Sequence, residues 1–270
     1  MTPAPSAVHP AAHATLRPDL AEVADRARPV VPAGERLLPV LPALRPLLPE
    51  EGLRRGSVVA VVGSTSLMLA VVAAASASGS WCAGVTVGRP SLHPEAASEL
   101  GVALERFPLV AALPGTRPGG WSWVVASLLD AVDVVAGWPA GRVRGADARR
   151  LAARGRERGS VLVVAGAGWT EAVDVRLTVV GSTWEGIGRG HALLLARRVE
   201  VASTGRGAAT RERRRVLWLP DNEGGVVDGG VAGALAPGNL APGNLAPGNL
   251  VPERQAPTRR AEPMPAGAAG

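Results

Sequence analysis

The stretch "VVAVVGSTSLMLAVVAAASA", Val58 to Ala77, decides how this chain folds. An apolar β-branched run leads into Gly63, Ser64, Thr65 and Ser66, and a second apolar run rich in Leu and Ala follows. Such a pattern has three interpretations: a phosphate loop that has lost its chemistry, a membrane span, or a buried strand followed by a buried helix.

The membrane interpretation rests on length alone. The uncharged interval from Gly56 to Gly88 is long enough to cross a bilayer of about 30 Å. However, a polar turn interrupts its middle, and the residue type changes from β-branched to Ala-rich at that turn. A buried strand followed by a buried helix is therefore favoured.

The phosphate-loop interpretation lacks its key residues. A Walker A loop needs G-x-x-x-x-G-K-S/T after a strand, because its backbone amides cradle the phosphates and its Lys contacts them. Here Leu67 follows Ser66 directly, the chain contains no Lys, and no Arg lies between Arg55 and Arg89. We expect no ATP hydrolysis and no cofactor, with Gly63 to Ser66 as a remnant of such a loop.

Short β-branched runs alternate with Ala- and Leu-rich stretches on both sides of this turn. The expected strands are Val58–Val62, Cys82–Val87, a segment near Phe107–Ala112, Val132–Ala136 and Val161–Ala165, and the expected helices are Leu67–Ser78, Pro94–Leu100, Trp121–Ala131 and Ala146–Arg158. This alternation predicts an α/β fold with a mostly parallel sheet. Residues 173–180, 191–201 and 215–219 alternate without intervening helices, which predicts antiparallel strands at one edge.

Three regions follow from composition. Residues 1–35 are rich in Pro, Ala and charge and are expected to be disordered, residues 36–221 form the domain, and residues 222–270 form a Pro- and Gly-rich tail. The tail repeats "LAPGN" three times. In the segment Leu37–Gly56, Leu pairs alternate with prolines, which allows only short apolar anchors.

Charge and cysteine content narrow the functional classes. All 29 basic residues are Arg, against 23 acidic ones, and the net charge of +6 leaves a weak attraction to polyanions. Cys82 is the single cysteine, so no intrachain disulfide forms, and its apolar surroundings predict a core position. The N-terminus lacks the basic and apolar regions of a signal peptide, so we expect a cytoplasmic protein without a membrane partner.

Other candidate sites lack supporting residues. The four His residues are scattered without Cys or carboxylate companions, so no metal site is expected. The stretch Gly186–His191, "GIGRGH", has no helix after it and is interpreted as a hairpin turn. Ser64, Ser66 and Ser122 have no neighbouring His and Asp of a hydrolase triad.

The order of "GLRRGSVVAVVG", the shortened turn, "ELGVALERF", "AVDVVAGW" and "RGSVLVVAG" resembles the core of a RecA-type recombinase domain, over about Leu37 to Leu219. More closely, it resembles the actinobacterial RecA-like accessory factors of the ImuA type. These work beside the inactive Y-family polymerase homologue ImuB and an error-prone polymerase in damage-induced mutagenesis. The resemblance implies a RecA-like three-layer sandwich.

The resemblance also implies that the ATPase residues are gone. Arg89 stands where a RecA ATPase carries its catalytic Glu, and Gly137 or Trp138 stands where the Mg²⁺-linked Asp is expected. Asp133 comes too early in its strand to replace that Asp, and small residues around Gly166 replace the polar residue that senses the γ-phosphate. The two loops with which RecA grips single-stranded DNA are short here.

The basic run from Arg206 to Pro220 has two interpretations: a solvated linker before an edge strand, or a docking segment for an acidic partner or for phosphates. In the second, three arginines steer the partner and three apolar residues anchor it: Arg213, Arg214, Arg215, Val216, Leu217 and Trp218. The resemblance thus implies a non-catalytic accessory protein that contacts an ImuB-like partner and its associated polymerase. The alternative is a RecA paralogue that binds single-stranded DNA.

Overall fold

The computed structural model describes residues 36–88, 92–112, 120–165, 168–169, 171, 173–185 and 194–230. The chain's contacts divide it into a unit of residues 1–234 and a unit of residues 235–270, and every described residue belongs to the first. No helix among the described residues is long and apolar enough to cross a membrane.

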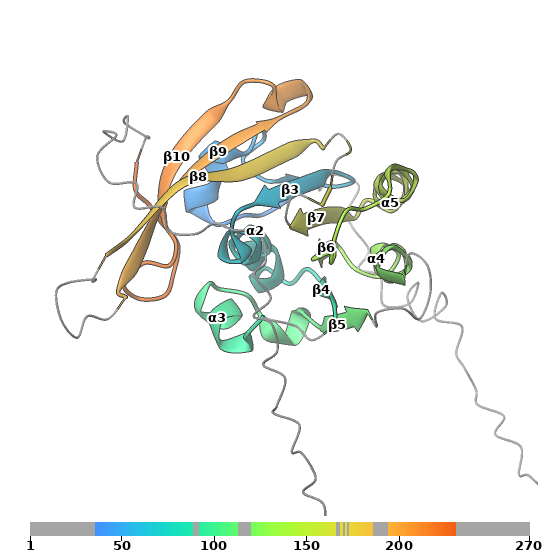
Figure 1. The fold of residues 1–270 in the computed structure, drawn as a ribbon, viewed down its shortest axis with the longest axis horizontal. Coiled ribbons are helices and arrows are strands. Elements are labelled where there is room, and N and C mark those ends of the chain that lie inside the picture. The colour runs from blue at the N-terminus through green and yellow to red at the C-terminus, as the bar shows by residue number, and fades with distance from the viewer. Residues whose placement is uncertain are drawn as a thin grey trace, which may run out of the picture. The chain divides into compact units, whose positions relative to one another are not determined.

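A nine-stranded sheet forms the centre of the fold, in the order β11-β10-β9-β8-β3-β7-β6-β4-β5 (Figure 1). Its strands are β3 (Val58–Val62), β4 (Cys82–Val87), β5 (Leu109–Ala112), β6 (Val134–Gly137), β7 (Val161–Ala165), β8 (Val175–Glu185), β9 (Ala196–Gly205), β10 (Arg213–Trp218) and β11 (Val227–Asp228). The six strands from β8 to β5 run parallel, whereas β9, β10 and β11 join antiparallel at the β8 side. The large, mostly parallel sheet predicted from the sequence is confirmed.

Helices cover both faces of the sheet (Figure 1). The helices α2 (Thr65–Ala77) and α3 (Pro94–Glu99) lie on one face, and α4 (Gly120–Leu129) and α5 (Gly145–Arg158) on the other. Three 3₁₀ turns complete the elements: η1 (Pro42–Leu47), η2 (Leu104–Arg106) and η3 (Gly207–Ala209). A separate two-stranded sheet pairs β1 (Leu37–Leu38) with β2 (Leu53–Arg54).

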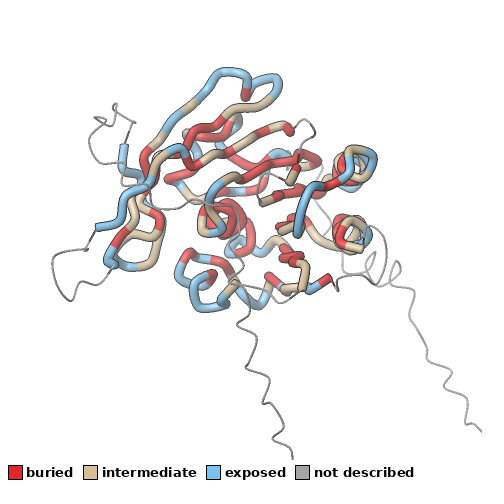
Figure 2. The backbone as a smooth tube through the Cα atoms, viewed as in Figure 1, coloured by how far each residue is buried: buried red, intermediate tan, exposed pale blue. Residues whose placement is uncertain are grey.

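The opening stretch forms a buried strand and a buried helix, as the sequence predicts. In β3, Val59 and Val61 pack toward α2, while Val58 and Ala60 pack toward α4 and α5, because side chains alternate along a strand. The helix α2 is apolar on all sides, with nine of its residues buried. A helix of that kind belongs inside a protein, and Figure 2 shows it and the central strands as buried.

Two expectations about the C-terminal part need correction. The strand at residues 173–180 was expected to be antiparallel, but β8 pairs parallel with β3 and antiparallel only with β9. The ordered chain also continues past the predicted boundary at Asp221, since β11 pairs with Leu217 and Trp218 of β10. Two residues of strand among glycines carry too weak a pattern to be recognised in the sequence.

Candidate functional site

The turn between β3 and α2 contains only Gly63 and Ser64. Gly63 adopts φ +89°, and a Cβ there would lie 3.3 Å from the Cβ of Val179 on β8. The Ser64 hydroxyl accepts a hydrogen bond of 3.1 Å from the Leu67 amide and caps α2, whose first residues are Thr65 and Ser66. A turn of this length caps its own helix and leaves no loop to wrap around a phosphate.

We expect Ser64→Ala to lower the free energy of unfolding by about 1 kcal/mol, because the Leu67 amide loses its acceptor. Ser64→Gly is the matched control and should cost only about a few tenths of a kcal/mol, since glycine leaves that amide open to water. Urea unfolding followed by circular dichroism measures both. Equal losses in the two variants would show that the hydroxyl does not act as a cap.

Indole rings cover the carboxyl ends of β4 and β6. Trp121 of α4 is 8% exposed, its Nε1 donates to the Val85 carbonyl at 3.4 Å, and a Cβ on Gly137 would lie 2.5 Å from its ring. Trp138 follows β6 directly and donates its amide to the same carbonyl at 2.7 Å. Gly137 and Trp138 thus stand at the end of this strand, as predicted, and the position above Gly137 is filled by an apolar ring.

Several predicted positions lie outside the described residues. They are Arg89, Gly166, the stretch Gly186–His191, and the histidines His9 and His13. Among the residues that the structure describes, no group of three or more His, Cys, Asp or Glu side chains could hold a metal ion.

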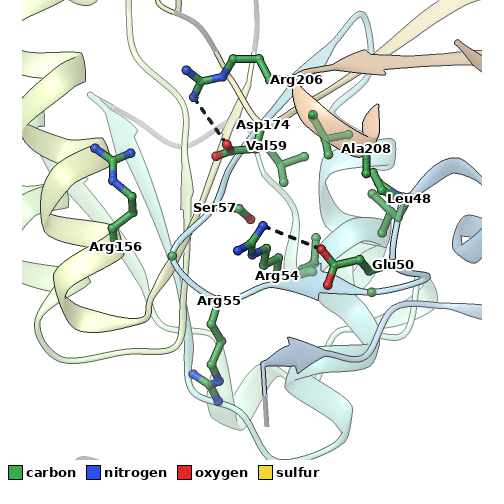
Figure 3. Close-up of a pocket in the computed structure, with 16 residues that line it drawn as sticks. Leu48, Glu50, Arg54, Arg55, Ser57, Val59, Arg156, Asp174, Arg206 and Ala208 are labelled. Carbon is green, nitrogen blue, oxygen red and sulfur yellow. Dashed lines mark hydrogen bonds and ion pairs between the residues drawn. The ribbon is translucent and has the colours of Figure 1, made fainter. Parts of the chain in front are cut away.

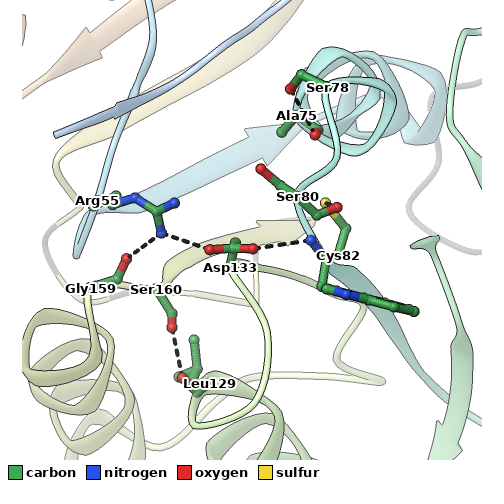
Figure 4. Close-up of polar contacts among 10 residues, drawn as sticks. Arg55, Ala75, Ser78, Ser80, Cys82, Leu129, Asp133, Gly159 and Ser160 are labelled. Carbon is green, nitrogen blue, oxygen red and sulfur yellow. Dashed lines mark hydrogen bonds and ion pairs between the residues drawn. The ribbon is translucent and has the colours of Figure 1, made fainter. Parts of the chain in front are cut away.

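Asp133 lies at the amino ends of the parallel strands (Figure 4). The β3–α2 turn lies at the other end of these strands, their carboxyl ends. Its side chain is 6% exposed; one oxygen accepts from Arg55 at 2.8 Å and the other from the Trp81 amide at 3.0 Å. Arg55 also donates to the Gly159 carbonyl at 3.4 Å. Asp133 therefore connects the segments that lead into β3, β4, β6 and β7, and its role in this fold is structural.

Cys82 of β4 is fully buried, as predicted, and burial, with a smaller contribution from Asp133, raises the pKa of its thiol from 9.0 to about 12. Because the unfolded chain ionises first, the stabilisation is complete below pH 9 and is lost as pH rises from 9 toward 12. The chain has no Lys and no Tyr, so no other side-chain type titrates within this window.

We therefore expect the free energy of unfolding to fall by about 1.4 kcal/mol per pH unit above pH 9 in the wild type. Cys82→Ala should remove that slope. Urea unfolding at several pH values measures it, and the comparison uses slopes because the alanine variant has a lower starting stability. The same slope in both proteins would contradict the assignment to Cys82.

A pocket of about 330 Å³ opens near Asp133, at the amino end of β3; it is named here the amino-edge pocket (Figure 3). Asp174, just before β8, accepts the Val58 amide at 2.8 Å and a bond from Arg206 at 3.4 Å. The arginines Arg54 and Arg156 also line the pocket. The charged groups around it come from segments far apart in the sequence.

The predicted docking segment is divided between core and surface. Val216 and Leu217 are 1% and 0% exposed, so neither side chain can anchor a partner in this fold. The prediction that they anchor a partner was wrong, because both belong to strand β10 and pack into the core. The three arginines before them in the sequence made the segment look exposed. Trp218 is partly exposed.

The three arginines of the segment reach the surface of β10. Arg214 pairs with Glu212 and, at 3.3 Å, with Glu200, and the hydrogen bond to Glu212 is the main reason that the pKa of Arg214 is raised. The guanidinium groups of Arg213 and Arg215 donate to backbone carbonyls only. The charges of Arg213 and Arg215 are therefore not balanced by a carboxylate among the described residues.

Asp174, Arg55 and Ser57 were not predicted from the sequence as site residues, and Arg206 was predicted only as the start of the basic run. One signal was present: "AVDV" occurs at residues 131–134 and again at 172–175, each time directly before or at the start of a strand. An acidic residue in front of two apolar strands indicates that its carboxylate binds the amides of neighbouring strand ends.

Two comparisons relate this chain to known proteins. The family model described as the MT3502 N-terminal domain matches residues 46–171, which include β2 to β7 and end before β8. The chain is also 38% identical over 123 residues to the uncharacterized protein Rv3395c of Mycobacterium tuberculosis. That alignment covers 45% of this chain and 57% of the other protein. Arg213 to Arg215 lie outside the part that the family model matches.

Proposed function

We propose that this protein is a non-catalytic, RecA-like accessory factor in damage-induced translesion synthesis, acting in the cytoplasm. It holds an ImuB-like Y-family polymerase homologue, together with its error-prone polymerase, through protein contacts. The three-layer arrangement, with a mostly parallel sheet and antiparallel strands at one edge, supports the RecA-like part of the proposal. The two-residue turn at Gly63 and Ser64 supports the non-catalytic part.

The outer edge of β10 carries the docking part of the proposal. β11 pairs with Leu217 and Trp218, and Gly229 and Gly230 after it exchange backbone hydrogen bonds with Val216. Among the described residues, no strand pairs with the outer edge at Arg213, Arg214 and Arg215. An open strand edge accepts an extended peptide as an additional strand. Arginines on such an edge favour acidic side chains in that peptide. The partner segment is therefore an extended, acidic stretch.

The experiment is co-purification of the full chain with the ImuB-like partner, using the variant R213E/R214E/R215E. Its control is R149E/R150E/R154E on α5, which makes the same change in charge at three arginines that each take part in an ion pair. Reversed charges on β10 should weaken binding by at least about tenfold, since like charges oppose docking. Deleting the strand is no substitute, because Leu217 belongs to the core.

Retention of the partner by both variants would refute docking at this edge. A second outcome concerns the alternative function, a paralogue that binds single-stranded DNA through its arginines. Tight DNA binding without a partner, weakening steeply with salt, would favour that alternative and would count against a purely protein-binding role.

A further inference from the structure

The amino-edge pocket has an apolar wall that a ligand could cover. Leu48, Leu53, Val59 and Val175 line it, and each is at least nine-tenths buried in the folded chain. Its volume of about 330 Å³ lies at the lower end of the range of about 300–1,000 Å³ that is usual for small-molecule sites. The pocket therefore suits a compact molecule better than a folded partner.

Ser57 supplies an unused polar group in this pocket. Its residue is 6% exposed, and its hydroxyl points into the space between the surrounding side chains in Figure 3. The Ser57 backbone is paired with Arg54 and Leu162, whereas its hydroxyl has no hydrogen-bond partner among the described residues. The Ser57 hydroxyl borders the open space of the pocket, where a ligand group can replace water as its hydrogen-bond partner.

Arginines surround the opening. Arg206 pairs with Asp174 at 3.4 Å, and Arg54 pairs loosely with Glu50 at 3.9 Å. Arg156 makes no ion pair with any described residue. Arg55 is neutralised by Asp133, so the remaining three arginines of the lining face two acidic residues, Glu50 and Asp174. The excess positive charge at the rim attracts an anion.

We propose that the amino-edge pocket binds a small molecule in which a compact apolar body carries one carboxylate or phosphate group. The apolar body contacts Leu53 and Val59, the anionic group binds Arg206 and Arg156 at the rim, and the Ser57 hydroxyl completes its hydrogen bonds. This site is independent of the docking edge on β10. The pocket lies at the amino end of β3, whereas the β3–α2 turn lies at the carboxyl end of that strand.

Four matched probes test the proposal by NMR titration of the full chain: hexanoate, hexyl phosphate, hexanol and inorganic phosphate. Hexanoate or hexyl phosphate should bind with shifts confined to residues around Ser57, and the tighter of the two identifies the anionic group. Hexanol lacks the charge and inorganic phosphate lacks the apolar body, so each should bind at least about tenfold more weakly. Equal binding of all four probes, or of none, would overturn the proposal.

Single substitutions at the charged and polar residues of the pocket test which of them bind the probe. Arg206→Gln and Ser57→Ala should each weaken the preferred probe by about tenfold. Glu50→Gln should strengthen it, because the lining loses a negative charge that repels the anion. Arg149→Gln on α5 is the control and should change nothing, since it lies outside the pocket. Weakened binding in the control, or unchanged binding in Arg206→Gln, would show that the arginine rim does not form the site.

Discussion

Replacing Asp133 with alanine is expected to lower the free energy of unfolding by about 3–5 kcal/mol, the largest loss that we predict for a polar residue here. The variant leaves the Arg55 guanidinium, whose side chain is 15% exposed, with only the Gly159 carbonyl at 3.4 Å. The Nε of Arg55 is already buried without a partner. The Trp81 amide also loses its acceptor at the start of β4.

Urea unfolding measures this loss, and Asp147→Ala is the matched control. Asp147 pairs with Arg150 at the same distance of 2.8 Å, but the Arg150 side chain is 77% exposed, so the loss should stay below about 1 kcal/mol. The double variant R55M/D133L should recover part of the stability, because it removes the isolated charge. Similar losses for Asp133→Ala and Asp147→Ala would contradict the structural role of Asp133.

Replacing Leu217 with alanine is expected to lower the free energy of unfolding by about 2–5 kcal/mol. Its side chain is 0% exposed and packs on the face of the sheet that η1 and α2 cover. The substitution removes buried apolar surface and leaves a cavity that the paired strands β9 and β10 cannot close.

Arg215→Ala on the same strand is the control for Leu217→Ala. Its guanidinium donates only to the Arg214 carbonyl, so its loss should stay within about 0.5 kcal/mol. Thermal and urea unfolding of both variants measures the difference. If Leu217→Ala were as stable as the wild type and instead lost only partner binding, the core position of Leu217 would be wrong and the anchor interpretation right.

The parts of the fold that the sequence predicted share one physical reason. The strand Val58–Val62 is uniformly apolar, and the helix Thr65–Ala77 is apolar from Leu67 to Ala75, so burial determines both. The helix was predicted as Leu67–Ser78, so its ends differ from the prediction by one or two residues. The carboxyl end of β6 could also be predicted, because Gly137 and Trp138 follow a recognisable strand. The local sequence pattern was sufficient to predict an element where its structure depends on residues close to it along the chain.

The amino-edge pocket could not be predicted in this way. Val58 and Asp174 are 116 residues apart, and their contact depends on β8 being placed next to β3. The burial of Val216 and Leu217 depends likewise on β11 covering the end of β10 at Leu217 and Trp218, and β11 has only two residues to indicate that. These features follow from strand order, which residue pattern alone does not determine.

In the proposed function, the protein binds a partner at the β10 edge without using a nucleotide. Isothermal titration of the full chain with the ImuB-like partner, with and without Mg²⁺ and ATP, tests it most directly. We predict one affinity under both conditions, no heat from ATP alone, and a loss of at least about tenfold in R213E/R214E/R215E. Binding that requires ATP, or equal binding by the reversed variant, would contradict the claim.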